Sequence, residues 1–287
     1  MLGDLKNMKK QLRSILVSSL IFIIFIFIFI VLMKFVNHTP KNTKTANFSY
    51  AIDNEKKDLS KKIMEELYKN ITGFIELSPE ERASIEGGYT KKCSIYGEIL
   101  YDSLQYILDK ESFGPTDVFY DFGSGVGKVV IQVYLNTPVR KAIGIELSIS
   151  RNNRALSALD SFKKTPYFSR YNHTNIEERE IDFYHENILK TDISDATIIY
   201  MASSCFAPEL LEKLVRKFEE INRKGLKIIT FKELPDYQAH GFQLDRTYSL
   251  PMSWSINGAT TAVFVFTYTG EKVEQKNTIE KNKEKKS

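Results

Sequence analysis

Residues 117–231 alternate between short apolar runs and longer runs with helical spacing. The strand-like runs "DVFYDF", "KAIGIEL", "IDFYH", "ATIIYM" and "LKIITF" are separated by helical patterns such as "KVVIQVYLN" and "PELLEKLVRKFEEINR". Strands that alternate with helices predict a parallel sheet with helices packed on it. The later runs "FQLDRTYSL" and "TTAVFVFTYT" alternate with a period of two, which predicts an antiparallel hairpin at the sheet edge. We therefore expect an α/β fold with a mostly parallel, seven-stranded sheet.

A glycine-rich turn follows the first predicted strand. In "DFGSGVGK", Gly123, Gly125 and Gly127 stand between the strand and the next helix. Glycines at such a turn let a ligand approach the backbone, and ligands of open parallel sheets bind at the carboxyl ends of the strands. Glu146 ends the second strand about 20 residues later, where an acidic residue hydrogen-bonds ribose hydroxyls. The pattern predicts a ligand that contains a nucleoside.

The turn departs from the dinucleotide fingerprint. Its pattern is G-x-G-x-G, and Asp121 directly precedes it. A carboxylate beside a pyrophosphate is unfavourable because two anions would share a poorly screened site. S-adenosyl-L-methionine has an ammonium group, a sulfonium group and a ribose but no phosphate, so Asp121 favours this ligand. An NAD site and an ordinary structural turn remain as alternatives.

Three further residues fit the same ligand. Asn187 follows the third strand and could bond the adenine amino group, while Ile188 could pack on the ring. Glu98, in "IYGEIL", could meet the amino-acid end of the ligand. The alternatives are an ordinary loop asparagine and a glutamate that complements the dipole of a helix first turn.

Residues 15–36 are apolar apart from two serines and a lysine. Their length suits a bilayer core of ~30 Å, which needs roughly 20 apolar residues. A cleaved signal peptide is the alternative, although its apolar region would span only about 7–15 residues. We expect a single-pass membrane protein with the lipid bilayer as a partner of residues 15–36. The flanking lysines do not orient the helix; two cysteines without an obvious pairing favour a catalytic domain that faces the cytosol or an equivalent reducing compartment.

The remaining chain divides by composition. Apolar residues at helical spacing from Leu59 to Ile75, a helix start after Ser78-Pro79, and a third pattern over 97–110 predict a helical cap. The C-terminal residues are rich in Lys, Glu and Asn, which predicts disorder. The expected organisation is a basic tail (1–14), a transmembrane helix (15–36), a linker (37–57), a helical cap (58–112), the α/β domain (113–270) and a disordered basic tail (271–287).

Composition does not favour two other classes of site. The four histidines and two cysteines have no zinc-ligand spacing, so no metal is expected. The net charge of +4 arises from 40 basic and 36 acidic residues that nearly cancel, so direct nucleic-acid binding is not indicated.

The order of "YGEIL", "DVFYDFGSGVGKVVIQV", "GIEL", "FAPEL" and "SW" resembles the disruptor-of-telomeric-silencing histone lysine methyltransferases over roughly residues 78–268. The resemblance implies a class I methyltransferase (Rossmann-like) fold, S-adenosyl-L-methionine as the methyl donor and N-methylation of a protein lysine, histone-like in its setting. A weaker resemblance is to membrane-tethered lysine methyltransferases of mitochondria. The family likeness implies that the donor site is lined by Tyr96, Gly97, Glu98, Ile99, Asp121, Phe122, Gly123, Ser124, Gly125, Val126, Gly127, Lys128, Val129, Val130, Glu146, Asn187 and Ile188.

The acceptor side departs from this family. Ala202-Ser203-Ser204 stands where the family has N-N-F, and the aromatic pair of the family's last strand is not evident. We expect Ser203 and Trp254 to be the catalytic residues on the acceptor side, with Phe206, Pro208 and Phe231 as candidates for an apolar channel. The alternatives are a methyltransferase with a small-molecule or lipid acceptor, a catalytically inactive membrane-tethered binding module, and a nicotinamide oxidoreductase.

Overall fold

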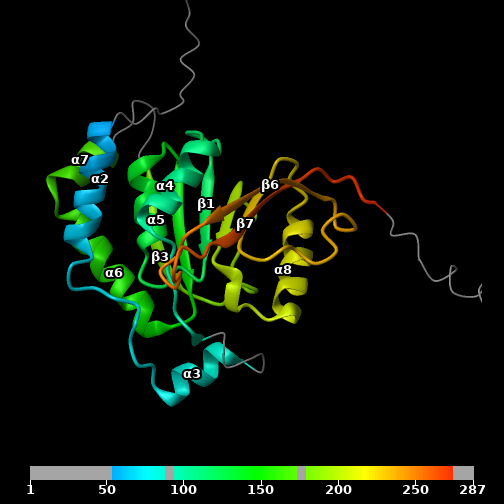
Figure 1. Ribbon diagram of the computed structural model, residues 1–287, viewed down its shortest axis with the longest axis horizontal. Helices are drawn as coiled ribbons and strands as arrows, with labels where there is room; N and C mark the ends of the chain where they lie inside the picture. The colour runs from blue at the N-terminus through cyan, green and yellow to red at the C-terminus, as the bar shows by residue number, and fades with distance from the viewer. Residues whose placement is uncertain (1–53, 88–93, 173–178, 274–287) are drawn as a thin grey trace, which may run out of the picture. The chain divides into compact units, whose positions relative to one another are not determined.

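A computed structural model describes residues 54–87, 94–172 and 179–273, which all belong to the second of two compact units, Tyr50–Ser287. Its centre is a seven-stranded sheet in the order β3-β2-β1-β4-β5-β7-β6, with helices on both faces (Figure 1). The strands are β1 (Val118–Phe122), β2 (Lys141–Glu146), β3 (Glu180–His185), β4 (Ile198–Met201), β5 (Lys227–Thr230), β6 (Phe242–Leu250) and β7 (Thr261–Tyr268).

The sheet confirms the predicted mixture of strand directions. Neighbouring strands from β3 to β5 pair in parallel, whereas β7 pairs antiparallel with both β5 and β6. Every residue of β1 and β4 is buried, as expected for central strands covered on both faces. The strand order reverses between β1 and β4, and ligands of open sheets bind at such a switch point.

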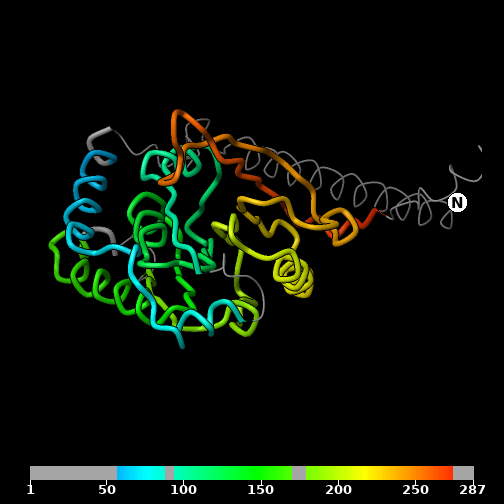
Figure 2. Tube along the Cα trace, turned by 60° about the horizontal axis from the view of Figure 1, so that its bottom comes forward, coloured from blue at the N-terminus to red at the C-terminus, as the bar shows by residue number. Residues whose placement is uncertain are grey.

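Helices form two unequal layers. One face of the sheet is covered by α2, α4, α5 and α6, and the other by α8. The short helix α3 stands apart from both layers (Figure 1). Figure 2 shows the described parts of the cap from another side, in blue and cyan. The helices are α2 (Asn54–Leu67), α3 (Pro79–Glu86), α4 (Tyr101–Lys110), α5 (Lys128–Asn136), α6 (Ile149–Lys163), α7 (Pro166–Asn172), α8 (Pro208–Ile221) and the 3-10 turn η2 (Ser203–Cys205).

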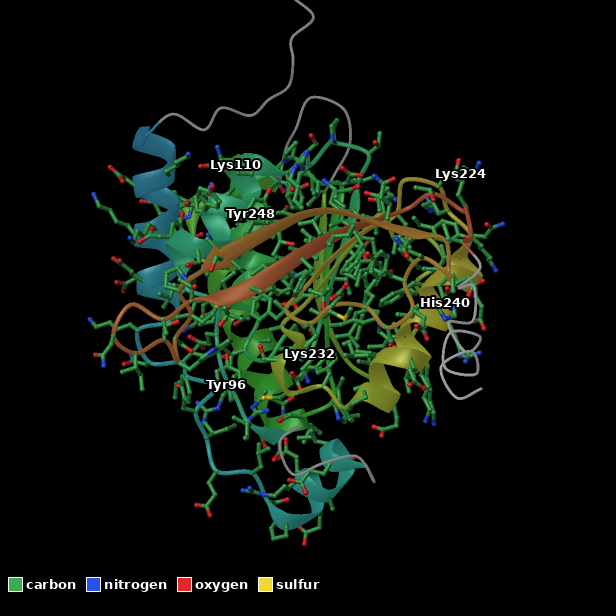
Figure 3. The ribbon with its side chains drawn as sticks, turned by 45° about the vertical axis from the view of Figure 1, so that its right-hand side comes forward. Tyr96, Lys110, Lys224, Lys232, His240 and Tyr248 are labelled. Carbon is green, nitrogen blue, oxygen red and sulfur yellow. The ribbon has the colours of Figure 1, made fainter. Side chains whose placement is uncertain are left out.

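A buried glutamate joins the cap to the far side of the sheet. Glu111, at the C-cap of α4, accepts hydrogen bonds from Lys227 of β5 at 2.7 Å and from Arg246 of β6 at 2.8 Å. Tyr248 donates a third at 2.7 Å, and Figure 3 shows it near Lys110 at the end of α4. The three bonds compensate the cost of burying this carboxylate.

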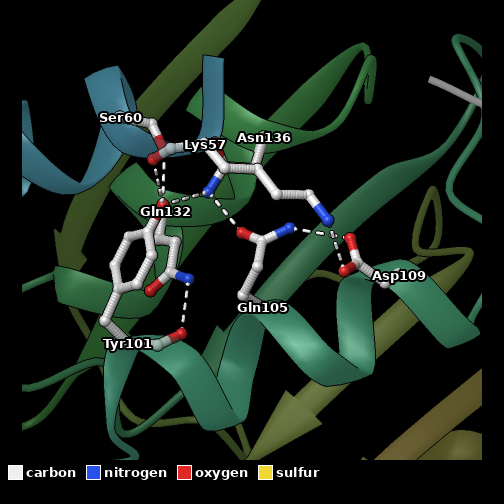
Figure 4. A network of polar contacts seen from close by, with 7 residues as sticks. All are labelled: Lys57, Ser60, Tyr101, Gln105, Asp109, Gln132 and Asn136. Atoms are coloured by element: carbon white, nitrogen blue, oxygen red, sulfur yellow. Dashed lines mark hydrogen bonds and ion pairs between the residues drawn. The ribbon is translucent and has the colours of Figure 1, made fainter. Parts of the chain in front are cut away.

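A polar network lies between α2, α4 and α5 (Figure 4). Its centre is Tyr101, whose hydroxyl contacts Ser60 of α2 and accepts a hydrogen bond from Asn136 of α5 at 3.1 Å. Gln132 donates to the Tyr101 carbonyl at 2.9 Å, and Asn136 also donates to Gln105 at 2.7 Å. This network fixes how the cap packs on the first helix after the glycine turn.

Two cap helices are shorter than the apolar spacing predicts. Helix α2 ends at Leu67, shortly before Asn70 and Gly73, which are poor helix formers. Gly73 leaves room for the Tyr96 ring, since a Cβ at this position would lie 2.0 Å from it. Helix α4 begins only at Tyr101, since Ile99 forms an isolated bridge with Met252. Glu98 therefore precedes the helix and does not lie in its first turn. The sequence patterns also missed α7 and η2.

The prediction of a membrane-anchored protein is corrected. In the described part of the chain, the helices are too short or too polar to serve as a bilayer span. Residues 15–36, on which the prediction depended, lie outside the described residues, as do residues 1–14, most of the predicted linker and residues 274–287. The transmembrane helix, the lipid bilayer as a partner, the single-pass topology and the cytosolic orientation are accordingly not retained.

Candidate active site

A cavity of about 450 Å³ opens at the carboxyl ends of the central strands. Gly123, Glu146 and Ala202 border it, and these residues lie at the ends of β1, β2 and β4. The volume lies within the range of about 300–1,000 Å³ that is usual for small-molecule sites. The other walls come from α3, from the segment before α4, from α6 and from the β6–β7 loop, through Ser84, Ile85, Gly97, Arg151 and Trp254.

The three glycines of the turn have different roles. All three have positive φ, at +83° for Gly123, +56° for Gly125 and +86° for Gly127. Gly123 borders the cavity, where an added Cβ would meet only Phe206, at 3.8 Å. At Gly125 and Gly127 an added Cβ would lie 2.6 Å from Tyr96 and 2.4 Å from Phe183. Only Gly123 is thus open to a ligand, and the other two admit aromatic rings.

Glu146 connects the glycine turn to helix α6. One carboxylate oxygen accepts from the Gly125 N–H at 2.8 Å, and the other accepts from the Ser148 N–H at 2.7 Å. Burial raises the pKa of the Glu146 carboxyl, although these backbone hydrogen bonds oppose the shift. The side chain still borders the cavity, so its remaining lone pairs are placed for ligand hydroxyls.

Asp121 is a buried carboxyl with no compensating side chain. It is 2% exposed and forms no side-chain hydrogen bond with the described residues. Burial, and secondarily the nearby Glu146, raise the pKa of Asp121 well above its usual value. Its register neighbour on β4 is Tyr200, whose buried hydroxyl also has no hydrogen-bond partner. Asp121 does not itself line the cavity, but it lies two residues before Gly123, which does.

Tyr96 lies against the glycine turn, because a Cβ added to Gly125 would be 2.6 Å from its ring. Its hydroxyl donates to Glu98 at 2.7 Å, and the Lys128 ammonium lies 2.7 Å from the other Glu98 oxygen. The Arg151 guanidinium lies 4.9 Å from the centre of the Tyr96 ring. Burial and the neighbouring Glu98 raise the pKa of the Tyr96 hydroxyl. Glu98 is thus already paired twice and does not line the cavity, which differs from its expected contact with the ligand.

Asn187 and Ile188 both border the cavity. The Asn187 side-chain oxygen accepts a hydrogen bond from the Leu189 N–H at 2.9 Å. The Asn187 amide nitrogen is then the atom that could contact a ligand, and it can only donate hydrogen bonds. Asn187 therefore suits an acceptor nitrogen of a purine ring better than the amino group that we expected it to bind.

Of the two residues predicted on the acceptor side, Trp254 borders the cavity and Ser203 does not. Ser203 is fully buried, and its hydroxyl lies 2.7 Å from Thr230 and accepts from the N–H groups of Phe231 and Lys232. This hydroxyl holds β4 to the end of β5 and does not reach the cavity, so we no longer assign it a catalytic role. Trp254 borders the cavity, is 40% exposed and donates to Thr261 at 3.2 Å.

Of the channel candidates, Phe206 lines the cavity and Phe231 packs behind Trp254, with ring centres 6.2 Å apart. Pro208 begins α8 and is not among the lining residues. The other predicted donor-site residues do not line the cavity. Ile99, Phe122, Val126 and Val130 are buried, and Val129 packs against the core cluster that contains Ile99 and Val130. The buried Ser124 hydroxyl has no hydrogen-bond partner among the described residues.

Sequence patterns missed several wall residues. Arg151 donates to the Ser94 carbonyl at 3.0 Å, and it lies in the first turn of α6, five positions after Glu146. The position of that helix start was predictable, because the helix after a second strand begins at the same edge of the sheet. The contributions of α3 were not, because no local motif connects them to the glycine turn. The missed wall residues are Ser84, Ile85, Gly87, Ile95, Ile145, Leu147, Arg151, Leu189, Ala202, Ser204, Cys205 and Leu210.

Comparison with known proteins settles the family. Residues 88–249 match the family described as "Histone methylation protein DOT1". This chain belongs to the DOT1 family. The match confirms the predicted family, and this DOT1-family chain carries the glycine turn, Glu146 and Asn187 inside the matched region.

Relatives and solved structures extend this comparison. A "Histone-lysine N-methyltransferase, H3 lysine-79 specific" of Caenorhabditis elegans is 32% identical over 139 residues, which are 48% of this chain and 15% of the relative. One of Dictyostelium discoideum is 29% identical over 143 residues, 49% of this chain and 8% of the relative. An RNA methyltransferase from Salinibacter ruber in complex with S-adenosyl-L-homocysteine is 21% identical, with a TM-score of 0.41, over 61% of this chain and 94% of that one. The DOT1-family chain thus spans only a small part of these curated relatives.

Proposed function

We propose that the chain is an S-adenosyl-L-methionine-dependent protein-lysine N-methyltransferase. Membership of the DOT1 family and the names of its relatives support the reaction and the donor. The observation that carries the assignment is a buried carboxyl without a compensating cation, Asp121, at the start of a glycine turn that borders a cavity. An uncompensated buried carboxyl is costly, and a cationic ligand relieves that cost where a pyrophosphate would increase it.

The residues around the cavity fit each part of this donor. In this proposal Glu146 binds the ribose hydroxyls and Asn187 and Ile188 contact the adenine. Asp121, which lies two residues before the lining residue Gly123, attracts the ammonium group. The Gly123 backbone is open to the ligand because an added Cβ would meet only the edge of the Phe206 ring, at 3.8 Å. These assignments follow from position at the ends of adjacent strands, where class I sites and other open-sheet sites lie.

Methyl transfer from this donor to a nitrogen needs little general acid–base catalysis. When bound, S-adenosyl-L-methionine supplies a methyl group on a positively charged sulfur. The chain must hold the accepting nitrogen in line with that methyl group, at about 3 Å. This orientation lowers the barrier to methyl transfer because the two reacting atoms are already aligned. It must also keep the amine neutral, and an apolar wall does so by disfavouring its charged form. Phe206 and Trp254 supply such a wall.

The acceptor side is the part that departs from the family. Ala202 and Ser204 border the cavity at positions where the family pattern has an asparagine and a phenylalanine. The second candidate is therefore a methyltransferase that acts on a small-molecule amine. This departure is the observation that favours it, since the donor side keeps its pattern.

The test is donor binding followed by methyl transfer. We expect the purified full chain to bind S-adenosyl-L-methionine by calorimetry and not to bind NAD. Labelled methyl groups should then appear on lysines when histone octamers or lysine-containing peptides are added. Transfer only to small amines would select the second candidate. Failure to bind the donor would contradict both.

A further inference from the structure

We infer that Glu81 is a positioning residue that closes helix α3 over the donor site and sets the geometry of Glu146. The inference rests on the proposed donor site, and it concerns a residue outside the cavity. It begins from the observation that α3 forms part of the cavity wall, although none of its residues is buried. Ser84 and Ile85 of α3, with Gly87 at its C-cap, line the cavity.

The Glu81 carboxylate joins the first turn of α3 to the start of helix α6. One Glu81 oxygen accepts from the Ser148 hydroxyl at 2.5 Å and from the Ser150 N–H at 2.9 Å, and the other accepts from the Ser150 hydroxyl at 2.7 Å. Both serines lie at the start of α6, where Ser148 is the N-cap. A carboxylate at a helix N-terminus is stabilised by the unpaired N–H groups and by the helix dipole.

The contact continues into the donor site through Ser148. The Ser148 hydroxyl binds Glu81, while the Ser148 N–H donates to Glu146 at 2.7 Å. The second Glu146 oxygen accepts from Gly125 at 2.8 Å. A continuous path of hydrogen bonds thus runs from α3 to the carboxylate placed for the ribose and on to the glycine turn.

The start of α6 also holds other parts of the cap, through the side chain of Arg151. The Arg151 side chain donates to the carbonyls of Ser94 and Gly73, at 3.0 Å and 3.4 Å. Arg151 contacts the segments on either side of α3 but forms no such bond with α3 itself. A second α3 carboxylate, Glu86, accepts a hydrogen bond from the Ser94 hydroxyl at 2.8 Å. Loss of Glu81 should therefore release the first turn of α3 from α6, while the end of α3 stays attached through Glu86.

The proposed role has two consequences for the donor. Release of the first turn of α3 from α6 loosens one wall of the cavity, which admits water to the bound donor and speeds its dissociation. Release of Ser148 from Glu81 also loosens the backbone that holds Glu146. Both effects weaken donor binding without changing the groups that face the acceptor.

The experiment compares Glu81→Ala with Glu80→Ala in the full chain. Glu80 is the preceding residue of the same helix turn, is exposed and contacts neither serine of α6. We expect Glu81→Ala to raise the dissociation constant and the KM for S-adenosyl-L-methionine about tenfold, the effect of losing a charged hydrogen-bonding group. The kcat should stay within about twofold, and Glu80→Ala should match the wild type. Glu81→Gln, which keeps one acceptor oxygen, should be intermediate.

A double variant distinguishes positioning from general destabilisation. If Glu81 acts through Glu146, then Glu81→Ala combined with Glu146→Gln should weaken donor binding less than the product of the single effects. Ser150→Ala, which removes one of the Glu81 hydrogen bonds, is the milder variant if Glu81→Ala does not fold. Unchanged donor affinity in a folded Glu81 or Ser150 variant would overturn the inference, as would fully additive effects.

The same assay separates this inference from the proposed function. If the wild-type chain does not bind S-adenosyl-L-methionine, the proposed function fails and the inference fails with it. If the wild type binds the donor and Glu81→Ala binds it equally well, only the inference about Glu81 fails.

Discussion

At the scale of single residues, positive φ alone does not identify a ligand-binding glycine. Gly123 borders the cavity, whereas Gly125 lies beneath the Tyr96 ring and Gly127 beneath Phe183. Outside the turn, Gly225 and Gly258 also have positive φ but would meet no atom within 4 Å if they carried a Cβ. These glycines all have positive φ, but they differ in the atoms that an added Cβ would meet.

Gly125→Val should disrupt the donor site through Tyr96. The new side chain would start 2.6 Å from that ring, so the ring must leave its place over the turn and its hydrogen bond to Glu98. We expect donor binding to be lost while the sheet remains folded, measured by calorimetry and circular dichroism. Gly225→Val, with φ +86° but open space, is the control and should retain binding. Equal donor affinity in the Gly125 variant would exclude the turn from the site.

Glu146→Ala should weaken donor binding by about 1–3 kcal/mol, the usual cost of removing a charged hydrogen-bonding partner. The structure adds a second cause, because Gly125 and Ser148 each lose an acceptor. Titration calorimetry on the folded variant measures the loss. An unchanged dissociation constant would remove Glu146 from the ribose.

Donor binding should depend on pH through Asp121. Burial raises the pKa of this carboxyl, so the folded state without ligand favours the neutral acid above the ordinary Asp pKa of about 3.9. A cationic ligand favours the charged form, so affinity should rise as pH rises from about 4 to about 7, below the pKa of about 7.7–8.0 of an α-amino group. Asp121→Asn should flatten this dependence. An equally steep profile in Asp121→Asn would show that another group titrates.

At the scale of elements, α4 is joined to the far end of the sheet by one buried carboxylate. The Glu111 side chain is 1% exposed and is paired with Lys227 and Arg246. Burial alone would raise the pKa of Glu111, but the hydrogen bonds from Lys227, Tyr248 and Arg246 outweigh it and lower the pKa. Its stabilising effect is therefore present above the ordinary carboxyl pKa and lost as the pH falls through the lowered value.

Glu111→Ala should destabilise the fold by about 3–5 kcal/mol, because it leaves the partly buried Lys227 ammonium without its partner. Urea unfolding at neutral pH measures this change in the free energy of unfolding. Asp102→Ala is the matched control, since its ion pair with Lys61 is exposed and such pairs contribute about 0–1 kcal/mol. Similar losses in the two variants would contradict the role given to Glu111.

At the scale of the whole molecule, the cavity is built from segments that are distant in the sequence. Residues from α3, from the turn after β1, from η2 and from the β6–β7 loop all border it. A ligand in this cavity therefore contacts both the cap and the sheet. Its binding energy should stabilise them together, because only the folded state presents these segments side by side.

Saturating donor should accordingly raise the free energy of unfolding. At a concentration 100 times its Kd, S-adenosyl-L-methionine should add about 2.7 kcal/mol, seen as an upward shift of the thermal midpoint. NAD at the same concentration should cause no shift. A larger shift with NAD would favour a dinucleotide site and contradict the proposed donor.

Residue spacing was enough to predict the sheet, its terminal hairpin, the glycine turn and the place of Glu146 at the end of the second strand. These features depend on local periodicity and on the direction of parallel strands, and both can be derived from residue spacing. The same reasoning put Asn187 and Ile188 at the cavity, because the ends of neighbouring parallel strands meet at one edge.

The direction of side chains and the contacts between distant segments depend on tertiary packing. Ser203 follows β4 as expected, but its hydroxyl points into the core, where it lies 2.7 Å from the Thr230 hydroxyl. Glu98 is paired with Tyr96 and Lys128, and Glu81 reaches α6 across 67 positions of sequence. Such contacts depend on how the cap packs on the sheet, and packing is a property of all the buried surfaces together, which no local pattern encodes.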